Sequence, residues 1–351
     1  MEFDATLAQL YAANLQLRTA SRIVVRLAEF PARAFYELER KARRVPWGEI
    51  VGPGSAVRFR VTAKKSRLYH ADAIAQRLQT AVGGERESSG SGEREAGSGA
   101  SLAAEDDGPD GLESGAQLFV VRVVRDVVTI SADSSGALLH RRGYRRAGGK
   151  APLRETFAAA MLLEAGYDGR GPLADPFCGS GTIAIEAALL ARRIAPGLNR
   201  TFAFEKWPDF DAMAWAALRE QASERILSAA AAPIAASDRD DGATASALAN
   251  AERAGVGRDI IFRTEAVSAV EPPGRAGLLA TNPPYGIRVG QGGDLRDLYA
   301  RLGALVRERW SGWTIAMLVA GPMPEREMGL SFTPRWESSN GGIPVRLLIR
   351  P

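Results

Sequence analysis

The 351-residue chain is 46% apolar and carries 45 Lys/Arg against 41 Asp/Glu, which is enough sequence to form the cores of two ordinary domains. It has no run of about 18 uncharged apolar residues, and its acidic start lacks the features of a signal peptide, so neither a membrane span nor secretion is expected. One cysteine and two histidines allow no intrachain disulfide and no zinc site of usual spacing, so we expect a cytoplasmic protein without a metal.

Residues 1–150 show a mixed α+β pattern and are predicted to form the first domain. Basic side chains dominate it, with 14 Lys/Arg against 7 Asp/Glu in residues 1–82 and 7 against 2 in residues 116–150. Such an excess favours a module that binds a polyanion, although a well-solvated surface would also account for it. Periodicity predicts helices over residues 7–19, 33–44 and 71–82, and strands over residues 21–27, 56–63, 117–125 and 126–131.

Residues 83–115 interrupt this first domain with a segment of different composition. They carry 9 Asp/Glu against 2 Lys/Arg, are rich in Gly and Ser, and have almost no large apolar side chains. A segment of this kind cannot bury enough surface to offset its ordering entropy. We expect a disordered acidic insert that supplies no site residue.

Residues 151–351 change to an alternation of short apolar strands and helices. This pattern predicts a Rossmann-like α/β domain with a mostly parallel sheet, in which ligands bind where the strands end. The predicted strands cover residues 173–175, 234–237, 260–263, 278–281 and 313–319, and the predicted helices cover residues 182–193, 211–231, 244–254 and 295–309.

The sequence Asp-Pro-Phe-Cys-Gly-Ser-Gly-Thr at residues 175–182 lies between a predicted strand and a predicted helix. Gly179 and Gly181 would let the backbone approach a ligand closely, and the helix start offers free N–H groups. The loop lacks the lysine of a nucleoside-triphosphate-binding loop and is not a Gly-x-Ser-x-Gly nucleophile turn. Cys178 is interpreted as a small apolar packing residue.

Acidic side chains follow the next two predicted strands. A carboxylate after residues 234–237 can hold a ribose diol, and Asp238, Asp240 and Asp241 are all candidates, although a helix cap fits Asp240 or Asp241 better. Glu265, after residues 260–263, could reach an adenine amino group or be a solvated surface charge.

The sequence Asn282-Pro283-Pro284-Tyr285 is the more specific signal for chemistry. The prolines fix the backbone so that the Asn282 side-chain oxygen and the Pro283 carbonyl can face one site. Two such acceptors would hold the protons of a planar amine and favour the geometry in which its lone pair can attack a methyl group. Tyr285 would stack on an extruded base.

These motifs resemble the class I S-adenosylmethionine-dependent methyltransferases, and more specifically the THUMP-containing RNA guanine-N2 methyltransferases of the ribosomal large subunit methyltransferase L family. Further segments resemble that family at residues 15–22, 139–145, 151–156, 195–200 and 250–255. The resemblance implies a Rossmann-like methyltransferase domain over residues 151–351 and a smaller THUMP domain over residues 1–150. It implies S-adenosylmethionine as the cofactor, held by Asp175, Phe177, Gly179, Gly181, Thr182, Asp238 and Glu265, with Asn282, Pro283, Pro284 and Tyr285 as the catalytic residues.

The implied activity is transfer of a methyl group to guanine N2, foremost in 23S ribosomal RNA, by a monomeric enzyme. A transfer RNA guanine-N2 methyltransferase and an inert RNA-binding or ribosome-assembly factor are the alternatives. DNA adenine and protein glutamine methyltransferases share Asn-Pro-Pro-Tyr, but the resemblance at residues 18–22 and 139–145 counts against both.

Overall fold

The computed structural model describes residues 2–52, 54–83, 115–145, 153–285, 295–321 and 323–351. The predicted acidic insert at 83–115 therefore lies almost wholly outside the described residues. The chain divides into two compact units. Unit 1 contains residues 1–14, 21–139 and 201–216, and unit 2 contains residues 15–20, 140–200 and 217–351. The sequence did not indicate that residues 15–20 belong to unit 2 or that residues 201–216 belong to unit 1.

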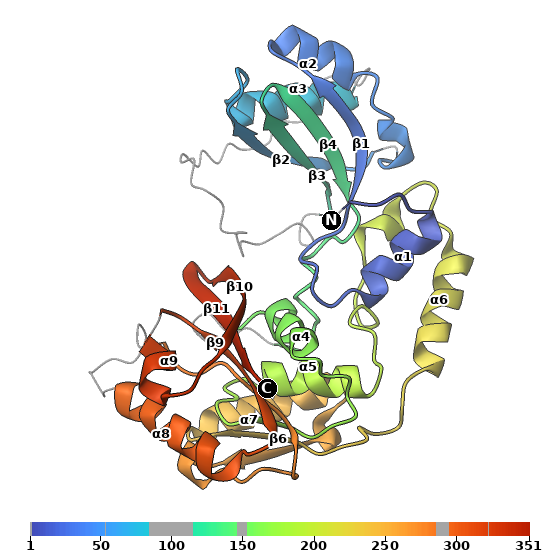
Figure 1. Cartoon of the computed structure of the whole chain (residues 1–351). Coiled ribbons are helices and arrows are strands. Elements are labelled where there is room, and N and C mark those ends of the chain that lie inside the picture. The colour runs from blue at the N-terminus through green and yellow to red at the C-terminus, as the bar shows by residue number, and fades with distance from the viewer. Residues whose placement is uncertain (1, 53, 84–114, 146–152, 286–294, 322) are drawn as a thin grey trace. The chain divides into compact units, whose positions relative to one another are not determined.

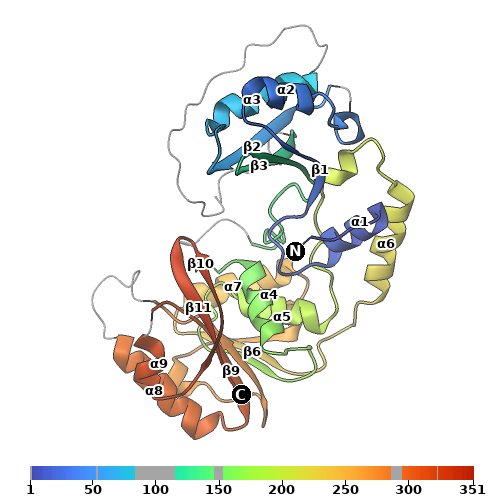
Figure 2. The same cartoon turned by 45° about the horizontal axis from the view of Figure 1, so that its top comes forward.

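Unit 1 is built around a four-stranded sheet with two helices on one face (Figures 1 and 2). The strand order is β1-β4-β3-β2, in which β2 and β3 are parallel and the other pairs antiparallel. Its elements are β1 (Val24–Pro31), α2 (Phe35–Ala42), η1 (Trp47–Glu49), β2 (Val57–Lys64), α3 (Ala71–Gly83), β3 (Gln117–Val124), β4 (Val127–Asp133) and η2 (Ala203–Lys206), and helix α1 (Leu7–Gln16) lies in it except for its last two residues.

The core of unit 1 lies between the sheet and helices α2 and α3. Alternate residues of β3, among them Phe119 and Val121, are completely buried there with Leu38 of α2 and Ile74 of α3. The period of two residues places the intervening side chains on the opposite face of the sheet. Consequently one face of this sheet packs against α2 and α3, and the side chains at the intervening positions lie on the face that these helices do not cover.

Strand β1 begins and ends later than the sequence predicted. The predicted strand began at Ser21, but Ser21 and Ile23 pair with the loop after β4, where their carbonyls accept hydrogen bonds from the amides of Leu139 and Ser134 at 2.8 and 3.0 Å. The strand then runs on to Pro31, which is tolerated because β1 is an edge strand.

Unit 2 contains a seven-stranded sheet of order β10-β11-β9-β8-β5-β6-β7. Strands β9, β8, β5, β6 and β7 are parallel, and β10 and β11 add an antiparallel edge. Its elements are α4 (Glu155–Glu164), β5 (Leu173–Asp175), α5 (Thr182–Ala191), β6 (Ile234–Asp238), α7 (Asp241–Arg253), η3 (Gly257–Asp259), β7 (Ile260–Thr264), η4 (Val267–Ala269), β8 (Gly277–Thr281), α8 (Leu295–Arg309), β9 (Trp313–Val319), α9 (Met323–Met328), β10 (Thr333–Asn340) and β11 (Ile343–Arg350). Helix α6 (Ala212–Glu224) has residues in both units.

Helices cover both faces of this sheet, as the predicted Rossmann-like fold requires. Helices α4, α5 and α7 pack on one face through one apolar cluster, and α8 packs on the other through a second cluster. Figure 1 shows the two groups on opposite sides of the strands. The predicted Rossmann-like α/β fold is therefore confirmed for this unit.

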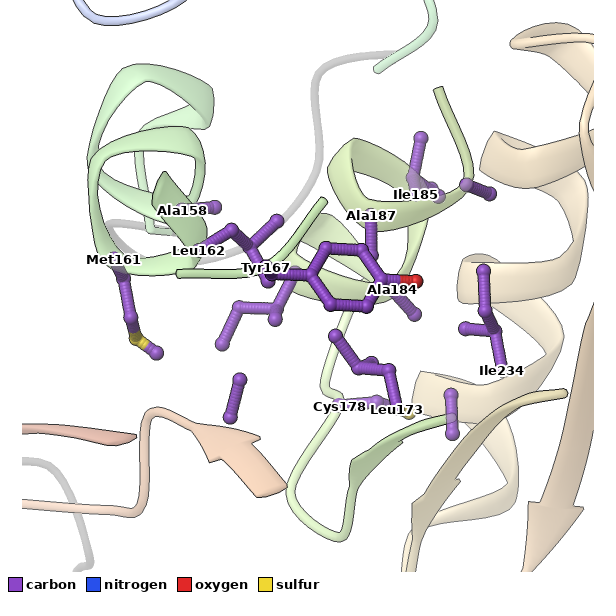
Figure 3. Close-up of a cluster of buried hydrophobic side chains, with 14 of the residues drawn as sticks. Ala158, Met161, Leu162, Tyr167, Leu173, Cys178, Ala184, Ile185, Ala187 and Ile234 are labelled. Atoms are coloured by element: carbon purple, nitrogen blue, oxygen red, sulfur yellow. The ribbon is translucent and has the colours of Figure 1, made fainter. Parts of the chain in front are cut away.

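The first apolar cluster includes one residue of the predicted cofactor loop, Cys178 (Figure 3). Cys178 lies in it beside Leu173 and close to Ile234. Burial raises the pKa of the Cys178 thiol above its ordinary value, so the reactive thiolate is disfavoured. This agrees with its interpretation as a packing residue.

Candidate functional site

The predicted site residues follow three neighbouring parallel strands. Strand β5 lies between β8 and β6 in the sheet. Its last residue is Asp175, the last residue of β6 is Asp238, and Asn282 directly follows β8. Because the carboxyl ends of parallel strands meet at one edge, the topology brings both predicted motifs to the same place.

The two glycines of the loop have different structural roles. Gly181 is the N-cap of α5 in the left-handed conformation (φ +82°), and a Cβ there would lie 2.9 Å from the Cβ of Ala247 on α7. Gly179 is also left-handed (φ +50°), but a Cβ there would have no neighbour within 4 Å among the described residues. Gly181 is therefore needed for packing between helices, whereas Gly179 faces open space that a ligand could occupy.

The structure distinguishes the three candidate aspartates after β6. Asp240 caps helix α7, because its side chain accepts a hydrogen bond from the amide of Ala243 at 2.8 Å. Asp238 instead reaches the glycine loop, where its carboxylate accepts from the amide of Gly179 at 3.0 Å. Asp241 accepts from the hydroxyl of Thr264 at 3.2 Å. Among the described residues, Asp238 is the one of the three that accepts a hydrogen bond from the loop predicted to hold the cofactor.

Asp175 is buried at the centre of this edge. One carboxylate oxygen accepts hydrogen bonds from the hydroxyl of Thr281 at 2.9 Å and from the amide of Phe177 at 3.3 Å. The other oxygen is buried and has no hydrogen-bond partner among the described residues. Burial raises the pKa of Asp175 to about 7, and the nearby charge of Asp238 acts in the same direction.

The Asn282–Tyr285 segment forms the second half of the site. The hydroxyl of Tyr285 donates a hydrogen bond to the side-chain oxygen of Asn282. The carbonyl of Pro284 accepts from the hydroxyl of Tyr299 at 3.1 Å. Tyr299 lies on α8 and is buried, which raises its pKa to about 12. The segment is thus hydrogen-bonded to α8 through Tyr299. Thr281, which directly precedes it, is hydrogen-bonded to Asp175 at the start of the glycine loop.

The remaining predicted residues lie around the same edge. Phe177 is half-buried and packs on the apolar cluster beneath α8, and Thr182 is the first residue of α5. Glu265 follows β7, is half-buried, and donates its backbone amide to the carbonyl of Asp238 at 2.9 Å. Its position is compatible with a ligand contact by the side chain, but the hydrogen bond to Asp238 uses the backbone amide of Glu265 and not the carboxylate.

Several supporting residues were not singled out as site residues from the sequence. Thr281 orients Asp175, and Tyr299 holds the Pro284 carbonyl. The guanidinium of Arg145 donates to the Thr182 hydroxyl at 2.6 Å, and the side-chain amide of Asn250 donates to the Ser180 carbonyl at 3.0 Å. Arg145 and Asn250 lie in the segments 139–145 and 250–255, which carry the family resemblance, so the sequence could have indicated them as site residues. Thr281 and Tyr299 gave no signal in the sequence.

The residues present fit a ligand with an amine, a carboxylate and a diol. The Asp238 carboxylate accepts from the amide of Gly179, whose Cα faces open space shortly before the N-terminus of α5, and Asp175 at the start of the same loop has a buried carboxylate oxygen without a partner among the described residues. No group of three or more metal-ligating side chains occurs within the described parts of the chain. Nor is any described helix both long and apolar enough to cross a membrane.

Comparison with known proteins assigns the family. The model described as "UPF0020: RMKL-like, methyltransferase domain" matches residues 142–348. The chain belongs to this family. The UPF0020 match covers the glycine loop and the Asn-Pro-Pro-Tyr segment, so both halves of the candidate site lie inside the methyltransferase domain.

Relatives of this UPF0020 protein extend over both units. A protein of Synechocystis sp. (strain ATCC 27184 / PCC 6803 / Kazusa), named "Putative RNA methyltransferase slr0064", is 33% identical over 97% of this chain and 85% of its own length. The ribosomal RNA large subunit methyltransferase K/L of Syntrophotalea carbinolica is 35% identical over 99% of this chain. The chain covers only 48% of that enzyme, or about half its length.

A solved structure shows the same fold. SMU.472, described as "a putative methyltransferase complexed with SAH", superposes with a TM-score of 0.82 at 27% identity, covering 98% of this chain and 88% of that one. The α/β methyltransferase fold predicted from the sequence is thereby confirmed for the UPF0020 chain.

Proposed function

We propose that this UPF0020 protein transfers a methyl group from S-adenosylmethionine to the exocyclic N2 of a guanine in RNA, with 23S ribosomal RNA as its first candidate substrate. The methyl donor is S-adenosylmethionine, in agreement with the SAH complex of SMU.472. One observation carries the proposal. Thr281, directly before Asn282, donates a hydrogen bond to Asp175, the first residue of the glycine loop, at 2.9 Å, and this contact supports a shared site for the two segments.

The residues proposed to hold the cofactor lie along the ends of β5, β6 and β7. Asp175 and the loop through Gly179, Gly181 and Thr182 would receive the methionine portion, where the partnerless oxygen of Asp175 can accept from an ammonium group. Asp238 would accept from the ribose hydroxyls. Phe177 and Glu265 complete the proposed set near the adenine.

The catalytic proposal rests on acceptors for the amine protons. An exocyclic base amine is a poor nucleophile because its lone pair is delocalised into the ring. The Asn282 side-chain oxygen and the Pro283 carbonyl would hold the two protons and favour attack by the lone pair, and the ring of Tyr285 would stack on the base. The Pro284 carbonyl, which already accepts from Tyr299, instead fixes the backbone of the segment.

The RNA assignment draws on the relatives and on the charge of unit 1. Synechocystis slr0064 and the K/L enzymes are named for RNA and ribosomal RNA. The Lys/Arg excess of residues 1–82 and 116–150 suits a polyanion, and we propose that residues 1–150 form a THUMP-like RNA-binding domain and residues 151–351 the methyltransferase domain. The monomeric state and the cytoplasmic location stay predictions.

The decisive test is methyl transfer from labelled S-adenosylmethionine to separated RNA fractions of a strain that lacks the gene. The proposal expects label in 23S ribosomal RNA and little in transfer RNA. Label confined to transfer RNA would support the rival substrate. No transfer to either fraction, together with no cofactor binding by calorimetry, would support an inert RNA-binding protein instead.

A further inference from the structure

The cations of β2 and β3 in unit 1 all lie on one face of the sheet. These strands contain four Lys/Arg and no Asp/Glu. Arg58, Arg60 and Lys64 are even-numbered residues of β2, and their register partners in β3 are also even-numbered, as is Arg122. The odd-numbered residues, such as Phe59 and Phe119, contact Trp47 in the core on the helix side. The even-numbered set therefore forms the face that α2 and α3 do not cover (Figure 2).

The part of this face nearest the β3–β4 turn is open. Thr62, Lys64, Arg122 and Val124 are exposed, and Val124 is 45% exposed. The register pairs Thr62 with Arg122 and Lys64 with Val124, so the four side chains are adjacent across two strands. The two cations at this end of the face are therefore accessible from solvent.

Further cations extend this surface at its rim. Lys65, Arg67 and Arg125 are exposed. Two hydrogen bonds connect the loop after β2 to the β3–β4 turn and keep these residues close. The amide of Arg125 donates to the Lys64 carbonyl at 3.2 Å, and the amide of Arg67 donates to the Asp126 carboxylate at 2.7 Å. The Asp126 carboxylate also pairs with Arg33 at 3.4 Å, which offsets its negative charge.

At the opposite edge of the same face, the cation is paired with acidic side chains. On β1, Arg26 pairs with Glu29 at 3.3 Å and with Glu2 at 2.6 Å. The positive charge is therefore concentrated on the β2–β3 side. We call the exposed residues Lys64, Arg122 and Val124, together with Lys65, Arg67 and Arg125, the basic sheet face.

We propose that the basic sheet face binds the phosphate backbone of double-helical RNA, an inference that rests on the proposed RNA methyltransferase activity. Phosphates complement a surface with several cations and no acidic side chain on its two strands. No aromatic residue occupies the even-numbered positions of β2 or β3, so this face cannot stack on splayed bases as single-strand-binding sheets do. It is suited to recognise the shape and charge of a duplex.

The test is a titration of the full-length protein with a fluorescently labelled RNA hairpin, and with a single strand of equal length, over a range of salt. The variant is Lys64→Glu/Arg122→Glu. The matched control is Arg40→Glu/Arg44→Glu, which makes the same charge change at exposed residues on and just after α2. We expect the first variant to bind the hairpin at least about tenfold more weakly at low salt. The slope of its log–log salt dependence should fall by about 1.4–1.8, because each of the two lost phosphate contacts removes roughly 0.7–0.9 of slope.

The control should retain most of the hairpin affinity. Thermal unfolding and cofactor binding of both variants should match the wild type, and if charge reversal prevents folding, Lys64→Gln/Arg122→Gln provides the same comparison. Equal losses in the two variants, or a loss confined to the single strand, would overturn the proposal. If the wild type methylates RNA but the Lys64→Glu/Arg122→Glu variant keeps full hairpin affinity, this inference is refuted and the proposed function is not. Absence of methylation by the wild type would refute the proposed function.

Discussion

The hydroxyl of Tyr285 donates a hydrogen bond to the side-chain oxygen of Asn282. This oxygen is the acceptor that the proposal assigns to the substrate amine. The acceptor is therefore occupied from within its own motif, and a bound base would have to displace the Tyr285 hydroxyl before the amine could take its place. The contact also keeps the Asn282 side chain satisfied when no base is bound.

Substitutions of Tyr285 separate the ring from the hydroxyl. Tyr285→Phe keeps the stacking surface and removes the competing donor, so we expect it to keep most of the turnover and to bind RNA no more weakly. Tyr285→Ala removes the stacking, which is worth about 1–3 kcal/mol per base, so turnover should fall by roughly 5–150-fold. Single-turnover methylation assays of both variants measure the difference. An equal loss in both would assign the essential role to the hydroxyl rather than to the ring.

Asp238 and Asp240 form a matched pair with different predicted roles. Asp238→Ala should weaken S-adenosylmethionine binding by at least about tenfold, the loss expected for a hydrogen bond to a charged group. Asp240→Ala removes the cap of α7 and should lower the free energy of unfolding by about 1 kcal/mol, with cofactor affinity kept. Calorimetric titration and urea unfolding of the two variants measure these effects. The reverse pattern would mean that Asp240 is the ribose ligand.

The buried carboxyl of Asp175 should make stability depend on pH. Burial raises its pKa to about 7, while its pKa in an unfolded chain is about 3.9. The folded protein thus keeps a proton that the unfolded chain releases between about pH 4 and pH 7, so the free energy of unfolding falls as pH rises through this window.

Asp175→Asn removes this ionisation, because the amide stays neutral at every pH. The variant should be about as stable as the wild type near pH 4 and more stable at pH 8, by up to about 4 kcal/mol, while it binds the cofactor more weakly. Urea unfolding at several pH values measures the two curves. Curves that run parallel from pH 4 to pH 8 would show that Asp175 is already ionised in the folded protein.

The predicted acidic insert, residues 83–115, is expected to be dispensable for folding. Replacing them with a short Gly/Ser linker between α3 and β3 should leave the unfolding temperature almost unchanged. It removes a segment in which acidic residues outnumber basic ones, so RNA affinity should rise modestly at low salt and little at physiological salt, where the Debye length is about 8 Å. Anisotropy titrations at two salt concentrations test this. A large loss of methylation would instead identify the segment as a working part of the enzyme.

The regular elements of unit 2 were largely predictable because their apolar periodicity is strong. Helix α8 and strand β9 have the predicted bounds, and the glycine loop joins the predicted strand and helix. The β10–β11 hairpin was missed. Strand β10 is mostly exposed at the edge of the sheet and has no apolar alternation, so its backbone pairing with β11 has little signature in its side chains.

Long-range contacts explain the other differences. The helix predicted over residues 7–19 ends at Gln16, because the following segment packs in unit 2, where the guanidinium of Arg18 donates to the carbonyl of Ile194 at 2.6 Å. The choice among Asp238, Asp240 and Asp241 likewise depended on which side chain reaches Gly179. Composition and spacing carry no information on partners so distant in sequence.

The most direct test of the account is the identity of the methylated nucleoside. Ribosomal RNA from a strain that lacks the gene is treated with the protein and deuterium-labelled S-adenosylmethionine, then digested and analysed by mass spectrometry. We predict labelled N2-methylguanosine. Asn282→Ala should lower its rate by about 10²–10³-fold, while S-adenosylmethionine affinity stays close to that of the wild type. Label in N6-methyladenosine, or a near wild-type single-turnover rate of Asn282→Ala, would contradict the account.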